Sequence, residues 1–461
     1  MLGSTAAALN AQSAAISVTG NNIANVNNPD YSRETVDISD TGEVATPDGD
    51  VATGMSVTVE QERDSVLDAM VQQEASLTSG FTAQQSLLSA AQAGLGENIT
   101  SSTTSTGTAA SATNSGLSAA VDDFFNAFES VAASPTDTGE AQALVQQAGV
   151  LTDRFQEVDA NLAQVQTDAN AQVTSGVQTA NGLLQQIAQL NTQIGALEAG
   201  KPGSAVDLRD QREGALEQLA ALVPVTSTEN AQGELSVTTT DTAGNSINLV
   251  SEGTVSNSLS YTGGVLQAGT TTLGVSSGSL QGTITASTGP VQTLRDNLNA
   301  MAQQMVTAVN AAYNPTGAAG GNFFNPTGTT AATISVASNL TPGTLTAGTG
   351  AAGDNSIAVA VANVANQTFS TANGDAINGT ISSFYGGAVS GIGQALDTAN
   401  TQVTDQTNVQ TIVTNQRASV SGVSVDEEMS NLMTYQRAYQ ASSEVLQVVS
   451  DMLSSLIQAV Q

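Results

Sequence analysis

The stretch VDEEMSNLMTYQRAYQASSEVLQVVSDMLSSLIQAV, at residues 425–460, decides the fold, because its apolar residues recur with a heptad period. One line of residues repeats every seven positions and a second fills the intermediate position, which is the spacing of a coiled-coil seam. The first line is Val425, Leu432, Tyr439, Leu446, Leu453 and Val460, and the second is Tyr435, Ser442, Val449 and Leu456. The stripe is narrow, so it predicts an amphipathic helix that needs another helix to bury it.

The other end of the chain carries a similar pattern. Small side chains, Ala6 and Ser13, take the intermediate positions, and four larger ones repeat every seven residues: Leu2, Leu9, Ile16 and Ile23. The predicted helix ends in NNIANVNNPD at residues 21–30, because asparagine competes for backbone hydrogen bonds and Pro29 disfavours helix in the residue before it. We expect the two terminal helices to pack on each other as a coiled coil.

Between the ends, the pattern predicts a mostly α chain with inserted β structure. A long helix over 140–197 turns at 200–203 and returns over 207–222. Runs rich in Thr and Val after Pro224 indicate a small β domain. The expected domains are 1–60, a heptad helix and extended linker; 61–223, a helical rod; 224–288, the β domain; 289–313, a returning helix; 314–375, a Gly/Thr-rich insertion; and 376–461, a helical return with the C-terminal helix. The insertion reads equally as a second small β unit or as a partly ordered segment.

The composition excludes most catalytic and nucleic-acid-binding functions. The chain has 9 basic and 41 acidic residues, a net charge of −32, no Cys, no His and one lysine, Lys201. Zinc sites, imidazole-based triads and thiol nucleophiles are therefore excluded, and we expect no cofactor, no metal and no enzyme activity. The negative charge opposes nucleic-acid binding. Without a long apolar stretch or a basic, apolar leader, we expect no membrane insertion and no cleaved signal peptide.

Several short motifs invite functional interpretations that their contexts do not support. Residues 348–353 match GxGxxG with Asp375 downstream, but no strand precedes them, so we expect a loop. Lys201 lies in a predicted turn, where a desolvated catalytic lysine is not expected. The paired acids lack calcium-loop spacing; they are Asp122 with Asp123, Glu427 with Glu428, and Asp48 with Asp50. The Asn-rich segment at 21–28 predicts either a helix cap and turn or amide pairing across a subunit boundary.

Four segments resemble one bacterial family. NNIANVNNPDYSR at residues 21–33 and GVSVDEEMSNLMTYQRAYQASS at 422–443 resemble the two ends of flagellar rod, hook and hook-associated proteins. Internally, DLRDQRE at 207–213, with Leu216 and Leu219, is similar to a helix of the hook-associated protein 1 family. Residues 294–313 followed by GGNFF at 320–324 resemble a later helix and turn of that family.

The resemblance implies a structural protein. Members of that family are exported uncleaved through the flagellar type III channel and form a ring at the tip of the hook, on which hook-associated protein 3 and the filament build. Their terminal helices form the inner tube, their β domain projects outward, and a chaperone docks on the C-terminal helix. The implied partners are thus copies of this chain, hook protein, hook-associated protein 3 and an export chaperone, at the hook–filament junction.

The candidate subunit interface follows from the heptads and the Asn-rich segment. It consists of Leu2, Leu9, Ile16, Asn21, Asn22, Ile23, Asn25, Tyr31, Leu432, Tyr435, Tyr439, Leu446, Val449, Leu453 and Leu456. Two alternatives stay open. One is a hook or rod subunit of the same family, and the other is a secreted β-rich adhesin, which the Thr/Gly tract at 314–375 suggests.

Overall fold

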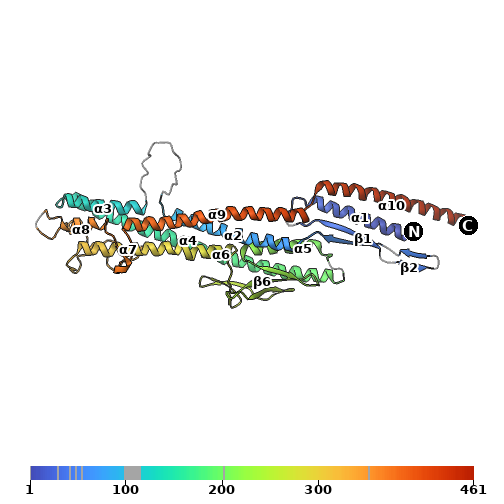
Figure 1. The fold of residues 1–461 in the computed structure, drawn as a ribbon, viewed down its shortest axis with the longest axis horizontal. Coiled ribbons are helices and arrows are strands. Elements are labelled where there is room, and N and C mark those ends of the chain that lie inside the picture. The colour runs from blue at the N-terminus through green and yellow to red at the C-terminus, as the bar shows by residue number, and fades with distance from the viewer. Residues whose placement is uncertain are drawn as a thin grey trace, which may run out of the picture. The chain divides into compact units, whose positions relative to one another are not determined.

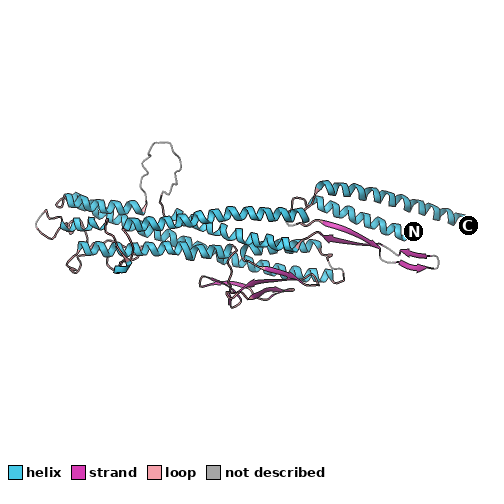
Figure 2. Ribbon diagram, viewed as in Figure 1, coloured by secondary structure: helices cyan, strands magenta, loops and turns pink. Residues whose placement is uncertain are grey.

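The computed structural model describes residues 2–28, 31–40, 43–46, 49–52, 55–97, 116–200, 203–350 and 353–460. They form two compact units. Unit 1 contains residues 1–80, 176–279 and 404–461, and unit 2 contains 81–175 and 280–403. Figure 1 labels the elements, and Figure 2 shows that most are helical, with a few small sheets. The expected fold class, mostly α with inserted β, is confirmed.

In unit 1 the two terminal helices pack together. Helix α1 (Leu2–Ala24) and helix α10 (Val425–Val460) lie side by side in Figure 2. The coiled-coil expectation for the chain ends is therefore confirmed. Strand β1 (Glu34–Asp40) follows α1 and pairs antiparallel with β4 (Met55–Gln61), while β2 (Glu43–Thr46) pairs with β3 (Gly49–Ala52).

The rest of unit 1 combines helical segments with two sheets. Helix α2 (Ser65–Gly94) and helix α4 (Thr138–Glu198) each contribute part of their length, and α5 (Val206–Leu222) follows α4 after a turn, as the sequence predicts. The sheets have the orders β5-β6-β7-β8 and β11-β10-β9. Their strands are β5 (Thr226–Glu229), β6 (Leu235–Thr240), β7 (Ser246–Ser251), β8 (Thr254–Val255), β9 (Leu259–Thr262), β10 (Val265–Ala268) and β11 (Thr271–Thr272).

The β structure ends earlier than the sequence predicts. Residues expected to be strand form helix α6 (Ser279–Ala286), which continues through a π-helical turn (Ser287–Val291) into α7 (Gln292–Tyr313). The Thr-rich composition favours strand, but Leu280 and Ile284, four residues apart, are both buried, which is a helical period. Packing therefore overrides the local propensity, and the π turn accommodates Pro290 inside the helix.

Unit 2 is built around an aromatic cluster. Helix α3 (Leu117–Ala133) contributes Phe124 and Phe128, whose rings lie 5.6 Å and 5.1 Å from that of Phe323. Asn310 on α7 accepts the backbone N–H groups of Phe323 and Phe324 at 3.0 Å and 2.8 Å. The GGNFF turn is thereby held in the core, where both phenylalanines are fully buried.

The 314–375 stretch contains little β structure among the residues that the structure describes. It holds helix α8 (Ser356–Val364) and turns, with isolated bridges in place of a sheet, and helix α9 (Ile381–Ser421) follows. The residues that match GxGxxG precede α8. The carboxylate of Asp354 accepts the backbone N–H groups of Gly350 at 2.7 Å and Ser356 at 2.9 Å. The loop therefore serves as a structural turn.

The remaining short motifs are distributed as follows. Lys201 and Asp48 lie outside the described residues, as does the side chain of Asp50, and Asp122 and Asp123 are exposed on α3. Within the described residues, no three metal-ligating side chains gather at one point. The described helices also lack a segment long and apolar enough to cross a membrane.

Candidate assembly interface

The buried face of α1 is lined mainly by small residues. Ala11, Ala15, Val18 and Asn22 are buried at spacings of four, three and four residues. Thr19, also buried, donates its hydroxyl to the carbonyl of Ala15 at 2.8 Å. Small side chains at these positions allow neighbouring elements to approach the α1 backbone closely.

The large apolar residues of α1 are less buried than this line of small residues. Leu9, Ile16 and Ile23 are half-buried, and the side chain of Leu2 lies outside the described part of the chain. Ala6 and Ser13, expected in the seam, are exposed. The heptad period is present, but the most buried line of α1 is that of Ala11, Ala15, Val18 and Asn22, and not that of Leu9, Ile16 and Ile23. The flanking Leu and Ile side chains therefore keep part of their surface open.

On α10 the apolar residues are less buried still. Leu432, Tyr435, Leu446 and Val449 are half-buried, whereas Tyr439 is exposed. Beyond them, Leu453 is 41 % exposed and Leu456 is 65 % exposed, with Met452 and Ile457 exposed beside them. The helix therefore keeps a large apolar surface, most of all in its last described turns.

Asn22 lies in the last turn of α1 and is only 1 % exposed. Its side-chain nitrogen donates to the carbonyl of Glu34 at 2.8 Å and to a carboxylate oxygen of Glu428 at 3.1 Å. Its side-chain oxygen accepts the N–H of Glu34 at 3.0 Å and the hydroxyl of Tyr31 at 2.8 Å. One amide thus connects α1, β1 and α10, using both of its donors and its acceptor.

The rest of the Asn-rich segment forms the end of α1. The side chain and the backbone N–H of Asn25 both donate to the carbonyl of Asn21 at 3.0 Å, and Asn21 is exposed. Asn25 therefore has the role that the first alternative predicts, in which the asparagines form a helix cap and turn. Asn22 makes its hydrogen bonds within the chain, and amide pairing between copies through the other asparagines stays a prediction.

Arg33 connects the first turn of α10 to the strand pair. Its Nε donates to Glu428 at 2.9 Å, and its other nitrogens lie 3.4 Å from Glu427 and 3.5 Å from Glu62. Its backbone N–H donates to the carbonyl of Ser421 at the end of α9. The acids of this first turn thus form ion pairs, in addition to any favourable interaction with the helix dipole.

A group of buried acids lies beside this centre. Burial, together with the nearby carboxylates of Asp207 and Asp210, raises the pKa of Glu34 to about 7. Burial also raises the pKa of Asp210 to about 6, although Arg63 lies 4.0 Å away. The hydroxyl of Tyr31 has a raised pKa for the same reasons, burial first and the surrounding carboxylates second.

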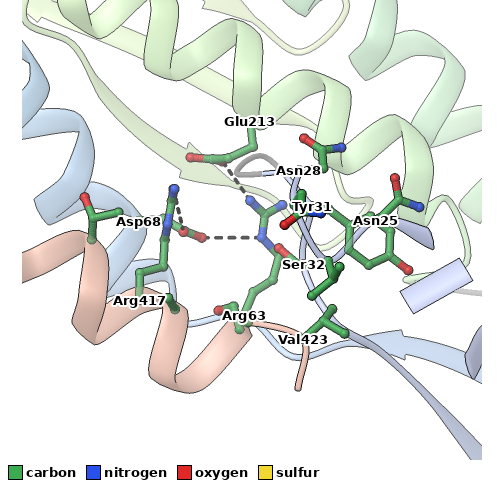
Figure 3. A pocket seen from close by; sticks show the side chains of 15 residues that line it. Asn25, Asn28, Tyr31, Ser32, Arg63, Asp68, Glu213, Arg417 and Val423 are labelled. Atoms are coloured by element: carbon green, nitrogen blue, oxygen red, sulfur yellow. Dashed lines mark ion pairs between the residues drawn. The ribbon is translucent and has the colours of Figure 1, made fainter. Parts of the chain in front are cut away.

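A cavity of about 250 Å³ adjoins the Asn-rich turn, and Figure 3 shows the charged side chains around it. Arg63 lies 3.4 Å from both Asp68 and Glu213. Arg417 on α9 lies 3.8 Å from Asp68 and also pairs with Glu217. These pairs connect α2, α5 and α9 at the point where the chain continues into the terminal helices.

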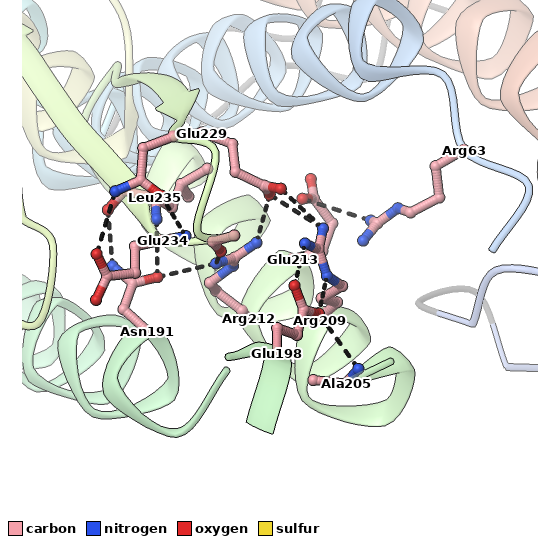
Figure 4. A network of polar contacts seen from close by, with 12 residues as sticks. Arg63, Asn191, Glu198, Ala205, Arg209, Arg212, Glu213, Glu229, Glu234 and Leu235 are labelled. Atoms are coloured by element: carbon pink, nitrogen blue, oxygen red, sulfur yellow. Dashed lines mark hydrogen bonds and ion pairs between the residues drawn. The ribbon is translucent and has the colours of Figure 1, made fainter. Parts of the chain in front are cut away.

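Helix α5, which carries DLRDQRE, uses two faces. One presents Asp210 and Glu213 to Arg63, and the other presents Arg209 and Arg212 to the β structure (Figure 4). Arg209 pairs with Glu198 at 2.7 Å and Glu229 at 2.9 Å. Arg212, 4 % exposed, donates to Asn191 at 2.9 Å and to the carbonyl of Gly233 at 2.6 Å. The motif therefore fixes helix α5 between the sheet and the strand pair.

Sequence reasoning did not identify the charged residues of this region. Arg33, Glu34, Arg63, Asp68 and Arg417 come from distant parts of the chain, so no local spacing joins them. The one available signal was their rarity: in a chain with only 9 basic residues, each arginine is a candidate for a specific partner.

Comparison with known proteins identifies relatives along nearly the whole chain. Residues 106–324 match the family described as the flagellar hook-associated protein FlgK helical domain. Residues 414–459 match the family described as the C-terminal region of flagellar basal body rod FlgEFG proteins.

Two curated relatives, both named flagellar hook-associated protein 1, are similar to nearly the whole chain. Flagellar hook-associated protein 1 of Bacillus subtilis is 25 % identical, over 98 % of this chain and 96 % of that protein. Its Salmonella typhimurium counterpart is 23 % identical, over 97 % and 98 %. Among solved structures, the flagellar hook junction protein FlgK from Burkholderia pseudomallei matches with a TM-score of 0.47 and 20 % identity, over 56 % of this chain and 46 % of that one.

Proposed function

We propose that this chain is a member of the flagellar hook-associated protein 1 family; residues 106–324, which match the model of the FlgK helical domain, support this. The proposed function is that of a structural subunit at the junction between hook and filament. The observation that carries it is the similarity to hook-associated protein 1 over 98 % of the chain, which includes both terminal helices.

The terminal helices are the proposed means of assembly. Leu9, Ile16 and Ile23 keep open surface on α1, and Leu453 and Leu456 are exposed on α10. Apolar surface of this kind is stabilised when another protein covers it. Copies of this chain would cover it in a ring, and hook protein and hook-associated protein 3 would contact the two sides of that ring.

Export is the second part of the proposal. The chain would travel unfolded through the flagellar type III channel without a cleaved signal and reside at the hook–filament junction. The absence of cysteine supports this route, because disulfides would obstruct an unfolded chain in transit. The exposed apolar turns at 452–457 would be covered by an export chaperone before secretion.

The contacts of the described residues support a structural role. The charged groups near Asn22 are engaged in ion pairs and hydrogen bonds within the chain, and the described residues form no metal-ligating cluster. The chain has no imidazole and no thiol. We therefore propose no catalytic activity and no cofactor.

The test is deletion of the gene, followed by electron microscopy of the cells and a flagellin assay of the medium. We expect hooks without filaments and flagellin released into the medium, both reversed by the intact gene. Loss of the hooks themselves would instead indicate a rod or hook subunit, the candidate that the rod-family match at 414–459 favours. Normal flagella would contradict both.

A further inference from the structure

Helix α9 contains four glycines within eight residues: Gly386, Gly387, Gly391 and Gly393. Each glycine favours a helix about fivefold less than alanine would. None of the four has a positive φ. A methyl group added to any of them would meet no described atom within 4 Å, apart from its chain neighbours and the adjacent backbone of its own helix. Neither backbone conformation nor packing within the described chain therefore requires glycine at these positions.

The glycine segment, residues 386–393, lies between two points at which α9 is anchored in the core of unit 2. Ile381 and Tyr385 are buried before it, and Ile392 and Ala399 are buried at and beyond its end. Residues 386–391 are all exposed or half-buried. The segment is thus fixed at both ends and lightly packed between them.

A cavity of about 560 Å³ lies beside the glycine segment. Phe384, Gly387 and Gly391 line it from α9. Pro290 and Leu294 line it from the π-helical turn and from α7. All of these residues belong to unit 2. The cavity therefore gives the glycine segment room to move toward α7.

The opposite wall of the cavity is tied to α4. Pro290 lies within the π-helical turn, and both prolines and π turns are common points of helix bending. In this chain, however, the carbonyl of Ser287 in that turn accepts the side chain of Gln166 on α4 at 3.1 Å. Arg295 on α7 donates to Gln166 at 2.8 Å and pairs with Asp159 at 3.0 Å. Among the described residues, the glycine segment has no such tie to α4.

We propose that α9 has two conformations in solution, the continuous helix described above and a bent one in which the glycine segment moves into the cavity toward α7. Glycine lowers the cost of leaving helical geometry, and the cavity removes the obstacle on one side. Contact with the apolar side chains of Phe384 and Leu294 offsets part of the lost helical order. The tied π-helical turn is the fixed surface toward which the segment moves.

This inference goes beyond the proposed function and concerns the free chain. A second conformation that is populated in the absence of any partner is a property of one molecule, so it can be measured in purified protein. Its presence or absence leaves the result of gene deletion unchanged, and the two proposals can therefore fail separately.

Distances between pairs of spin labels test the proposal directly, because the chain contains no cysteine of its own. Ser382→Cys with Thr398→Cys places labels at exposed positions on either side of the glycine segment, which a continuous helix separates by about 24 Å. Gln146→Cys with Ala160→Cys places labels at exposed positions about 21 Å apart on α4. The α4 pair shows the width of the distance distribution that the labels alone produce. Both labelled chains are measured by pulsed electron paramagnetic resonance.

We expect the α9 pair to show a peak near the distance of a continuous helix and a second population at shorter distance, whereas the α4 pair shows a single peak. Gly387→Ala with Gly391→Ala should reduce the shorter-distance population at least fivefold, because alanine favours the helix at both positions and both methyl groups would extend into the cavity. Gly149→Ala, at an open glycine of α4, is the matched control and should leave that population unchanged.

A change on the opposite wall tests the part played by the cavity. Asn297→Leu places a larger side chain in the lining from α7 and alters no glycine, so we expect it also to reduce the shorter-distance population. A single peak for the α9 pair, no wider than that of the α4 pair, would overturn the inference while the four glycines are intact. A shorter-distance population that survives either the alanine variant or Asn297→Leu would overturn it as well.

Discussion

Helix α3 of unit 2 and helix α10 of unit 1 are both amphipathic, but they bury their apolar residues to different extents. On α3 the whole apolar stripe is buried; it consists of Leu117, Ala120, Val121, Phe124, Phe125, Phe128 and Val131. On α10 none of the apolar side chains that the structure describes is buried. The contrast indicates that unit 2 completes its core within one chain, whereas the terminal helices need further partners to cover their surface.

The largest expected effect is in the aromatic core. Phe124→Ala removes a fully buried ring that contacts four other phenylalanines. We expect a loss of about 3–5 kcal/mol in the free energy of unfolding, the usual range for such a truncation. Thermal or urea unfolding of the purified chain measures it. Val359→Ala, at an exposed site on α8, is the control, and an equally small loss for both would show that the cluster is not a core.

Asn22→Ala should have the next largest effect. It removes four hydrogen bonds and leaves the backbone of Glu34 without its side-chain partner in a buried place. We expect a loss of about 2–3 kcal/mol, within the cost of unsatisfied buried groups. Hydrogen exchange should show faster opening of α1 and β1. Asn21→Ala, one residue away and exposed, should change little. Equal effects would mean that the Asn22 side chain does not hold α1, β1 and α10 together.

Glu34→Gln separates a charge effect from a packing effect. The pKa of Glu34 is about 7 in the folded chain against an ordinary value of 4.5, so folding favours its protonated form. The stability linked to this group is complete at acid pH and is lost as pH rises through 7. The variant should therefore gain up to about 3 kcal/mol at pH 8 and nothing at pH 4, because each pKa unit corresponds to about 1.4 kcal/mol.

Thermal unfolding at both pH values measures that gain. The control is Glu60→Gln at an exposed position of the paired strand β4, where the substitution should change stability little. A gain that is the same at pH 4 and pH 8 would show that the carboxyl of Glu34 is not charged and buried in the way described.

The heptads at 2–23 and 425–460 predicted the terminal helices and their pairing, because a helical period is a local property of the sequence. They did not predict which line of α1 is most buried, since that depends on the other elements that pack against the helix. The contacts around Asn22 and Arg63 could not be predicted for a stronger reason. Asn22, Glu34 and Glu428 meet only after folding, and no local pattern records that Arg63 and Arg417 share Asp68.

Composition misled the prediction at one boundary. Ser279–Ala286 has the Thr content of a strand, but burial of one helical face decides its structure. In contrast, no local pattern reveals the physical role of the GGNFF turn, because its two phenylalanine amides are held by Asn310, more than ten residues away in the sequence. Local period was thus predictable, whereas partners distant in sequence were not.

The central claim is that the terminal helices are completed by other subunits, and one double variant tests it most directly. Leu453→Asp with Leu456→Asp changes two exposed apolar residues of α10, so the free chain should keep its unfolding free energy within about 0.5 kcal/mol. Gln447→Asp with Ser450→Asp adds the same charge at exposed polar positions of the same helix and is the control.

Each variant is expressed in cells that lack the gene, and hooks and filaments are counted by electron microscopy. We predict normal filaments with the control and hooks without filaments with the leucine variant. Normal filaments with both would contradict the account.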